Sequence, residues 1–111
     1  MSIMRLETMA GGKIDSNYIT SMDLSVQNLG AEEFDFLLHM YYNGAIGYVA
    51  LHHVPAYGSV WVPDVPTNLI PFSMLLVTNI NSYTTTGIVT YAKLNGNVVA
   101  VYSQEDFIRL P

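Results

Sequence analysis

The chain contains no cysteine, which removes three kinds of chemistry. Without a thiol there is no disulfide framework, no thiolate metal site and no cysteine nucleophile. Basic residues are nearly as scarce, because only Arg5, Lys13, Lys93 and Arg109 carry positive charge and the net charge is −5. These four do not cluster. Nucleic acids and anionic membranes both attract a basic patch, so we expect neither as a partner.

Long hydrophobic runs are missing as well. No apolar stretch approaches the roughly 20 residues of a membrane-spanning helix, so we expect no membrane insertion. The opening residues Met1 to Glu7 include an acid and lack an apolar core. We therefore expect no secretory signal.

Charge of either sign is sparse, at 12% of residues. Between Phe36 and Ala92 the only charged residue is Asp64. Interface cores are depleted of charge because desolvating a charged side chain costs free energy. The pattern predicts a homo-oligomer whose sister subunits cover the middle of the chain. A lightly charged monomer is the alternative.

Strand signals dominate what is present. Apolar and polar residues alternate from Ser21 to Gln27, a period of two that is typical of a strand. The segment 31–40 is ambiguous, because its apolar residues also fit one face of a helix. We favour a strand there, since an Asn-Gly pair follows Tyr41-Tyr42 directly.

Two Asn-Gly pairs predict β-hairpins, because both residue types accept the positive φ of a tight type I′ turn. Asn43-Gly44 leads into a strand over 45–51. Asn95-Gly96 joins a strand over 86–94 to another over 97–102.

Proline and glycine divide the rest of the chain. Prolines at 63, 66 and 71 exclude a central strand and predict an extended connection, with a strand over 73–80 and a polar loop over 82–85 after it. Turn formers at 11–17 predict an N-terminal arm over residues 1–19, strand-like at Ile3 to Glu7, and a single domain over 20–111. The arm packs on a neighbouring subunit or is partly disordered, and the apolar tail at 107–110 docks on the body.

Six or seven short strands separated by turns predict an all-β fold. An antiparallel β-sandwich or a small β-barrel with an N-terminal arm fits this count.

Catalytic patterns are absent. No serine lies in a Gly-x-Ser-x-Gly motif, and the acidic residues lie singly or within turns. His52 and His53 are neighbours, so on a strand they point to opposite faces and cannot chelate one metal together. Either of them could pair with His39 across the first hairpin, but no third ligand is evident. We predict a non-enzymatic protein without a cofactor or metal.

The positive chemical signal is aromatic. Tyr57 and Trp61 flank a glycine-containing turn, with further tyrosines, Tyr83 among them, nearby in the chain. Aromatic rings with polar tips suit sugar rings and protein interfaces. The candidate ligand-binding residues are Trp61, Tyr57, His52, His53 and Asp64. Packing of Trp61 in the core is the alternative interpretation.

The order of elements from Met40 to Tyr102 is similar to that of a known family. Its parts are the hairpin Asn43-Gly44 to Leu51, the segment Val65-Pro66 to Pro71, the strand Ser73 to Val77, the strand from Thr86-Gly87, and the hairpin Leu94 to Tyr102. This order resembles the C-terminal head domain of bacteriophage receptor-binding proteins, found at tail-fibre tips or baseplates.

The resemblance implies a homotrimeric virion head that binds a host-surface saccharide and contacts other virion proteins. Saccharide sites in that family follow no fixed motif, so no site residue is transferred from it. A structural virion protein, such as a decoration or connector subunit, is the alternative function. A cellular β-sandwich interaction module is a third.

Overall fold

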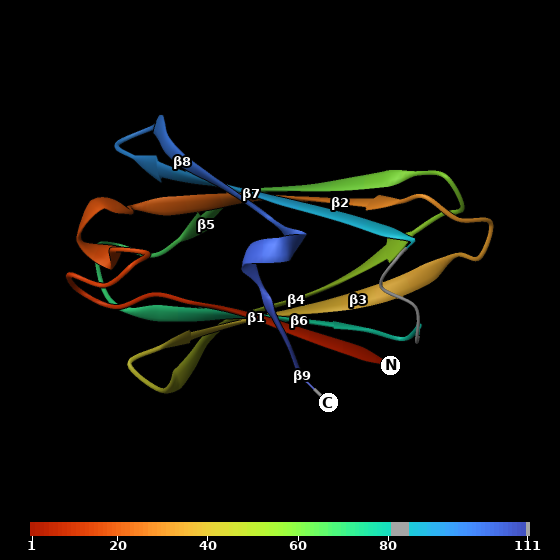
Figure 1. Ribbon diagram of the computed structural model, residues 1–111, viewed down its shortest axis with the longest axis horizontal. Helices are drawn as coiled ribbons and strands as arrows, with labels where there is room; N and C mark the ends of the chain where they lie inside the picture. Colours follow the sequence, from red (N-terminus) through yellow and green to blue (C-terminus); the bar gives the residue numbers. More distant parts are fainter. Residues whose placement is uncertain (81–84, 111) are drawn as a thin grey trace.

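The computed structural model describes residues 1–80 and 85–110, which form two antiparallel sheets packed face to face (Figure 1). Strand order is β4-β3-β6-β1-β9 in the five-stranded sheet and β5-β2-β7-β8 in the four-stranded sheet. The strands are β1 (Ser2–Glu7), β2 (Ser21–Asn28), β3 (Phe34–Tyr42), β4 (Ala45–Val54), β5 (Ser59–Pro66), β6 (Phe72–Thr78), β7 (Thr86–Leu94), β8 (Asn97–Ser103) and β9 (Ile108–Leu110). Two short 3-10 turns, η1 (Ser16–Tyr18) and η2 (Gln104–Asp106), complete the described elements.

The all-β prediction is confirmed, and the architecture is a sandwich rather than a closed barrel. The structure has nine described strands against the expected six or seven, and β1 and β9 come from the first and last described residues. Among the described residues no helix is long and apolar enough to cross a membrane. Tyr83 and most of the polar loop expected over 82–85 lie outside the described residues.

The first residues are part of the sandwich. β1 pairs along its whole length with β6, from Ser2 opposite Thr78 onward, and its other edge pairs with β9, where Ile3 lies opposite Leu110. Met4 and Leu6 point into the core and are almost fully buried. The structure therefore differs from the expected arm over residues 1–19, because burial of alternate side chains draws Ser2–Glu7 into a sheet.

The core fills the space between the two sheets. Alternate residues of each strand point inward, and on β3 the burial pattern repeats every second residue. The largest fully buried side chains are Phe34, Phe36, Met4, Leu6, Met22, Leu24, Leu38, Met40, Met74, Leu76, Ile88 and Val26. The segment 31–40 therefore supplies strand β3, as favoured from the sequence, and not a helix.

Both predicted hairpins are present. Asn43 and Gly44 have φ of 52° and 85° between β3 and β4. Asn95 and Gly96 have φ of 52° and 88° between β7 and β8. Positive φ at both central positions is the geometry that makes Asn-Gly favourable in such turns.

The proline-rich segment forms the edge of the four-stranded sheet. β5 pairs with β2 alone, so Pro63 and Pro66 remove no donor that a second neighbouring strand would need. The pairing shifts register between Met22 and Leu24, and Asp64 takes a positive φ of 54° opposite this shift. This irregularity turns the Asp64 carboxylate towards the outer face of the sheet, where it meets Lys93.

Candidate functional site

Two of the five predicted ligand-binding residues lie together on the outer face of the four-stranded sheet. Trp61 and Asp64 both belong to β5. Strand β2 separates β5 from β7, and the outward side chains of β7 are Val89, Tyr91 and Lys93. Tyr91 and Lys93 reach across β2 towards β5 and complete the arrangement.

The aromatic part of this face is a pair of rings. Trp61 and Tyr91 have ring centroids 5.7 Å apart and planes inclined at 55°. Trp61 remains 52% exposed. The interpretation of Trp61 as a core residue is therefore wrong, because strand alternation directs its side chain away from the buried Val62.

A network of charges lies beside the rings. The Lys93 Nζ atom is 3.0 Å from Asp23 Oδ1 and 2.5 Å from Asp64 Oδ1. The Asp64 backbone N–H donates to the same Asp23 oxygen at 2.8 Å. The hydrogen bond that Lys93 donates to Asp64, followed by the one that it donates to Asp23, raises the pKa of Lys93. Lys93 is therefore a protonated donor held in place by two carboxylates.

The three charged residues differ in their access to solvent. The side chains of Asp23 and Lys93 are only 11% and 13% exposed, whereas that of Asp64 is 74% exposed. Asp23 thus holds Lys93 from the buried side of the network, and Asp64 presents free acceptor sites to solvent. We call the group Trp61, Tyr91, Asp23, Lys93 and Asp64 the platform.

Sequence reasoning missed Tyr91, Asp23 and Lys93. Tyr91 and Lys93 occupy outward positions of the strand that was predicted over 86–94. Asp23 lies opposite Tyr91 in the pairing of β2 with β7. The signal needed was this register across three strands, which the linear sequence does not display.

The other predicted residues lie elsewhere. Tyr57 is in the turn between β4 and β5, where it is 72% exposed with a φ of 56°. His52 lies on β4 in the other sheet and stacks on Phe36 with ring centroids 5.2 Å apart. His53 points outward from β4, on the opposite side of the sandwich from the platform. The structure therefore does not bring either histidine to Trp61.

His53 has two acidic neighbours. Its Nδ1 atom is 2.7 Å from Asp35 Oδ1, and its Nε2 atom is 3.6 Å from Glu33 Oε2. The hydrogen bond with Asp35 is the largest cause of a raised pKa for His53. Within residues 1–80 and 85–110 no three histidine or acidic side chains are grouped to hold a metal ion.

The hydrogen bond between His53 and Asp35 predicts a measurable shift in the pKa of His53. We expect NMR titration to give His53 a pKa above the 6.5 of a free imidazole, and Asp35→Asn to lower it. Because the folded-state value is raised, the stabilisation is complete below the unfolded pKa and is lost as pH rises through the folded one. An unchanged His53 titration in Asp35→Asn would contradict the assignment.

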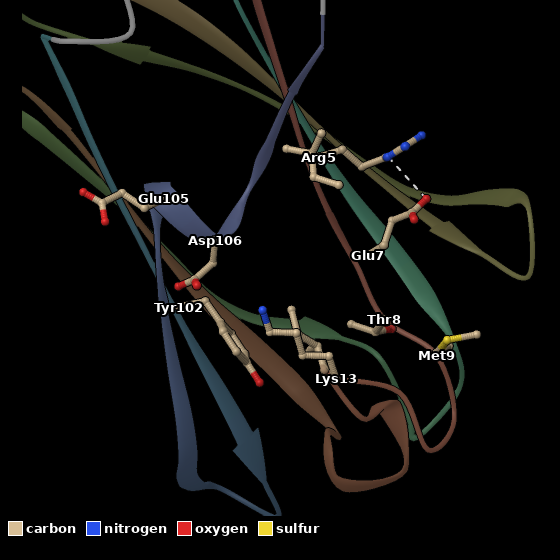
Figure 2. Close-up of a pocket in the computed structure, with 10 residues that line it drawn as sticks. Arg5, Glu7, Thr8, Met9, Lys13, Tyr102, Glu105 and Asp106 are labelled. Carbon is tan, nitrogen blue, oxygen red and sulfur yellow. Dashed lines mark ion pairs between the residues drawn. The ribbon is translucent and has the colours of Figure 1, made fainter.

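A cavity of about 470 Å³ opens at one side of the sandwich, near the end of β1. Figure 2 shows Lys13 and Tyr102 extending into the space between β1 and η2. Its charged lining is mixed, with Arg5 and Lys13 among the acids Glu7, Glu105 and Asp106. None of the predicted ligand-binding residues lines it.

Comparisons with known proteins bear on the fold alone. No protein-family model matches the chain, and no curated protein matches it. A solved structure described as the crystal structure of Thermotoga maritima 1070 superposes with a TM-score of 0.55 and 8% sequence identity. The match covers 92% of this chain and 90% of that one. The sandwich as a whole therefore has a counterpart among known structures.

Proposed function

We propose that the chain is a saccharide-binding adhesion module and that the platform is its binding face. The observation that carries this proposal is the exposed ring pair of Trp61 and Tyr91 beside the Asp64 carboxylate. Burying a large aromatic side chain stabilises a fold by about 1.5–3 kcal/mol, and this tryptophan is half-exposed on a flat sheet. Such a ring is available to a ligand.

The chemistry of the platform matches both surfaces of a sugar. The C–H face of a pyranose packs on an aromatic ring, and the hydroxyl groups at its rim need donors and acceptors. Asp64 accepts from a hydroxyl, and Lys93 offers a third N–H beyond those directed at the two carboxylates. An open sheet surface suits several residues of an extended saccharide better than a single terminal sugar.

The sequence resemblance supports the biological setting. A phage receptor-binding head attaches to saccharide on the surface of a host cell, and we propose that ligand class and a virion location for this chain. A shallow site binds weakly, so several copies acting together are needed for firm attachment. Self-association is therefore part of the proposed function.

A structural virion subunit is the second candidate. It is favoured by the many exposed apolar side chains on the sheet opposite the platform, such as Leu51 at 70% and Val49 at 55% exposure. Such a subunit would assemble but bind no sugar. The experiment below separates the two functions.

The test is a glycan array followed by calorimetric titration of the best soluble oligosaccharide. We expect Trp61→Ala to weaken binding at least about tenfold, because one stacking partner is lost. Asp64→Asn should weaken it less, since the amide keeps one acceptor oxygen. Tyr41→Ala, an aromatic deletion on the outer face of the other sheet, is the matched control and should leave the affinity unchanged.

The outcomes are distinct. An array without hits rejects the adhesion function and favours the structural subunit. Hits whose affinity is unaffected by Trp61→Ala, in a variant that unfolds at the wild-type temperature, reject the platform as the binding face. Tyr57→Ala then tests the remaining predicted aromatic residue.

A further inference from the structure

The outer face of the five-stranded sheet is apolar across its whole width. One row of outward side chains runs through all five strands, in the order Leu51, Leu37, Val77, Ile3 and Leu110. A second row contains Val49, Leu75 and Ile108, interrupted by His39 and Arg5. We call these eight apolar residues the apolar face.

These side chains are accessible on the single chain. Leu51, Val49 and Ile108 are 70%, 55% and 56% exposed, and the other five are half-buried. Scattered apolar residues are normal on a protein surface, but a continuous patch of this kind marks an interaction site. Its flatness suits another flat surface, since sheets pack face to face about 10 Å apart.

The size of the face fits a pair of copies. Five strands at about 4.8 Å spacing and a strand length of about 20 Å give about 500 Å² of sheet surface per copy. Two such faces in contact bury about 1,000 Å², which is the lower bound for a specific interface. The outer surface of the five-stranded sheet, with the two rows of the apolar face at its centre, therefore just reaches the area of a specific dimer.

Ion pairs lie at both ends of the face. Glu33 and Asp35 lie beside β4, next to His53. Arg5 lies on β1 near the other end, where it pairs with Glu7 at 3.3 Å. A two-fold axis in the plane of the interface and parallel to the strands places Glu33 and Asp35 of one copy over the end of the other that carries Arg5 and Glu7.

We propose that a second copy of this chain packs its own apolar face against this one, as a two-fold dimer. The pairing leaves the platform of each copy on the outside, because platform and apolar face lie on opposite sides of the sandwich. The inference does not depend on saccharide binding. It differs from the trimer that the sequence resemblance implies, and the solution mass separates the two.

The test measures mass by light scattering on a sizing column. We expect about twice 12.3 kDa for the unmodified chain. Val49→Lys places two extra charges in the dimer interface, so it should raise the dimer dissociation constant at least about 100-fold. Val101→Lys is the matched control, because Val101 is also 55% exposed and on an edge strand, but in the other sheet. It should leave the dimer intact.

The contrary results are equally specific. A monomer at all concentrations, or a trimer, overturns the two-fold pairing. A dimer broken by Val101→Lys but not by Val49→Lys assigns the interface to β8 instead and overturns the proposed face. Leu51→Lys repeats the test should Val49→Lys not fold. The monomeric variant should keep wild-type affinity for a soluble saccharide, so failure here is distinguishable from failure of the platform.

Discussion

Replacing Phe36 by alanine is expected to lower the free energy of unfolding by about 3–5 kcal/mol. Phe36 is 1% exposed and points into the core from β3, which lies between β4 and β6 in the five-stranded sheet. Its ring also supports His52, whose imidazole stacks on it at a centroid distance of 5.2 Å. Alanine leaves a cavity that neighbouring β-strands, held by pairing on both sides, fill only in part. The free energy of unfolding of the whole domain therefore depends strongly on this side chain.

Urea unfolding followed by tryptophan fluorescence measures this loss, since Trp61 is the single tryptophan. Phe36→Leu is the control, because it keeps most of the apolar volume and should cost less than half as much. The slope of free energy against urea should remain unchanged for both variants. A loss below about 1 kcal/mol for Phe36→Ala would be inconsistent with a well-packed site and its cavity cost.

Asp23→Ala is expected to cost about 2–3 kcal/mol, more than any other change on the platform. Its carboxylate accepts from Lys93 at 3.0 Å and from the Asp64 backbone at 2.8 Å. Removing it leaves a mostly covered ammonium with one partner and a backbone donor with none. The β5 irregularity at Asp64 then loses the bond that holds it, so saccharide binding should fall as well.

Two companion variants separate the contributions. Asp64→Ala removes the exposed carboxylate but keeps Asp23 with Lys93, so stability should change by less than about 1 kcal/mol. Saccharide affinity should nevertheless fall. Asp23→Asn keeps an acceptor oxygen for the Asp64 N–H and should recover part of the stability. Equal stability losses for Asp23→Ala and Asp64→Ala would show that the buried Asp23 contributes no more to the network than the exposed Asp64.

The parts of the fold that were predictable depend on short-range chemistry. Asn-Gly at 43–44 and 95–96 demanded positive φ, and two hairpins followed. Prolines kept the segment 59–66 out of the sheet interior, and it became an edge strand. These features need only a few neighbouring residues, so they are readable along the chain.

The placement of the first strand was not predictable in the same way. Ser2–Glu7 shows a weak alternation, followed by turn formers that suggested an arm. Its location follows from partners far along the chain, since β6 and β9 flank it on both sides. No local pattern encodes which distant strands will pair with a given strand.

The candidate site shows the same division. Trp61 and Asp64 could be selected by residue type, and both are on the platform. Tyr91, Asp23 and Lys93 join them only through the register of three strands. His52 was selected for its chemistry, but it pairs opposite the inward-facing Phe36 and stacks on the core.

The pairing of β1 with β6 and β9 has a consequence for how the molecule folds during synthesis. During synthesis Ile3 leaves the ribosome long before Leu110, its partner on β9. Contacts between residues distant in sequence carry a large entropic cost before they stabilise anything, and all-β domains accordingly fold in milliseconds to seconds. The β3–β4 hairpin can form early from neighbouring residues. The five-stranded sheet is complete only when β6 and β9 have both paired with β1, so burial of the Met4 and Leu6 side chains waits for strands made later.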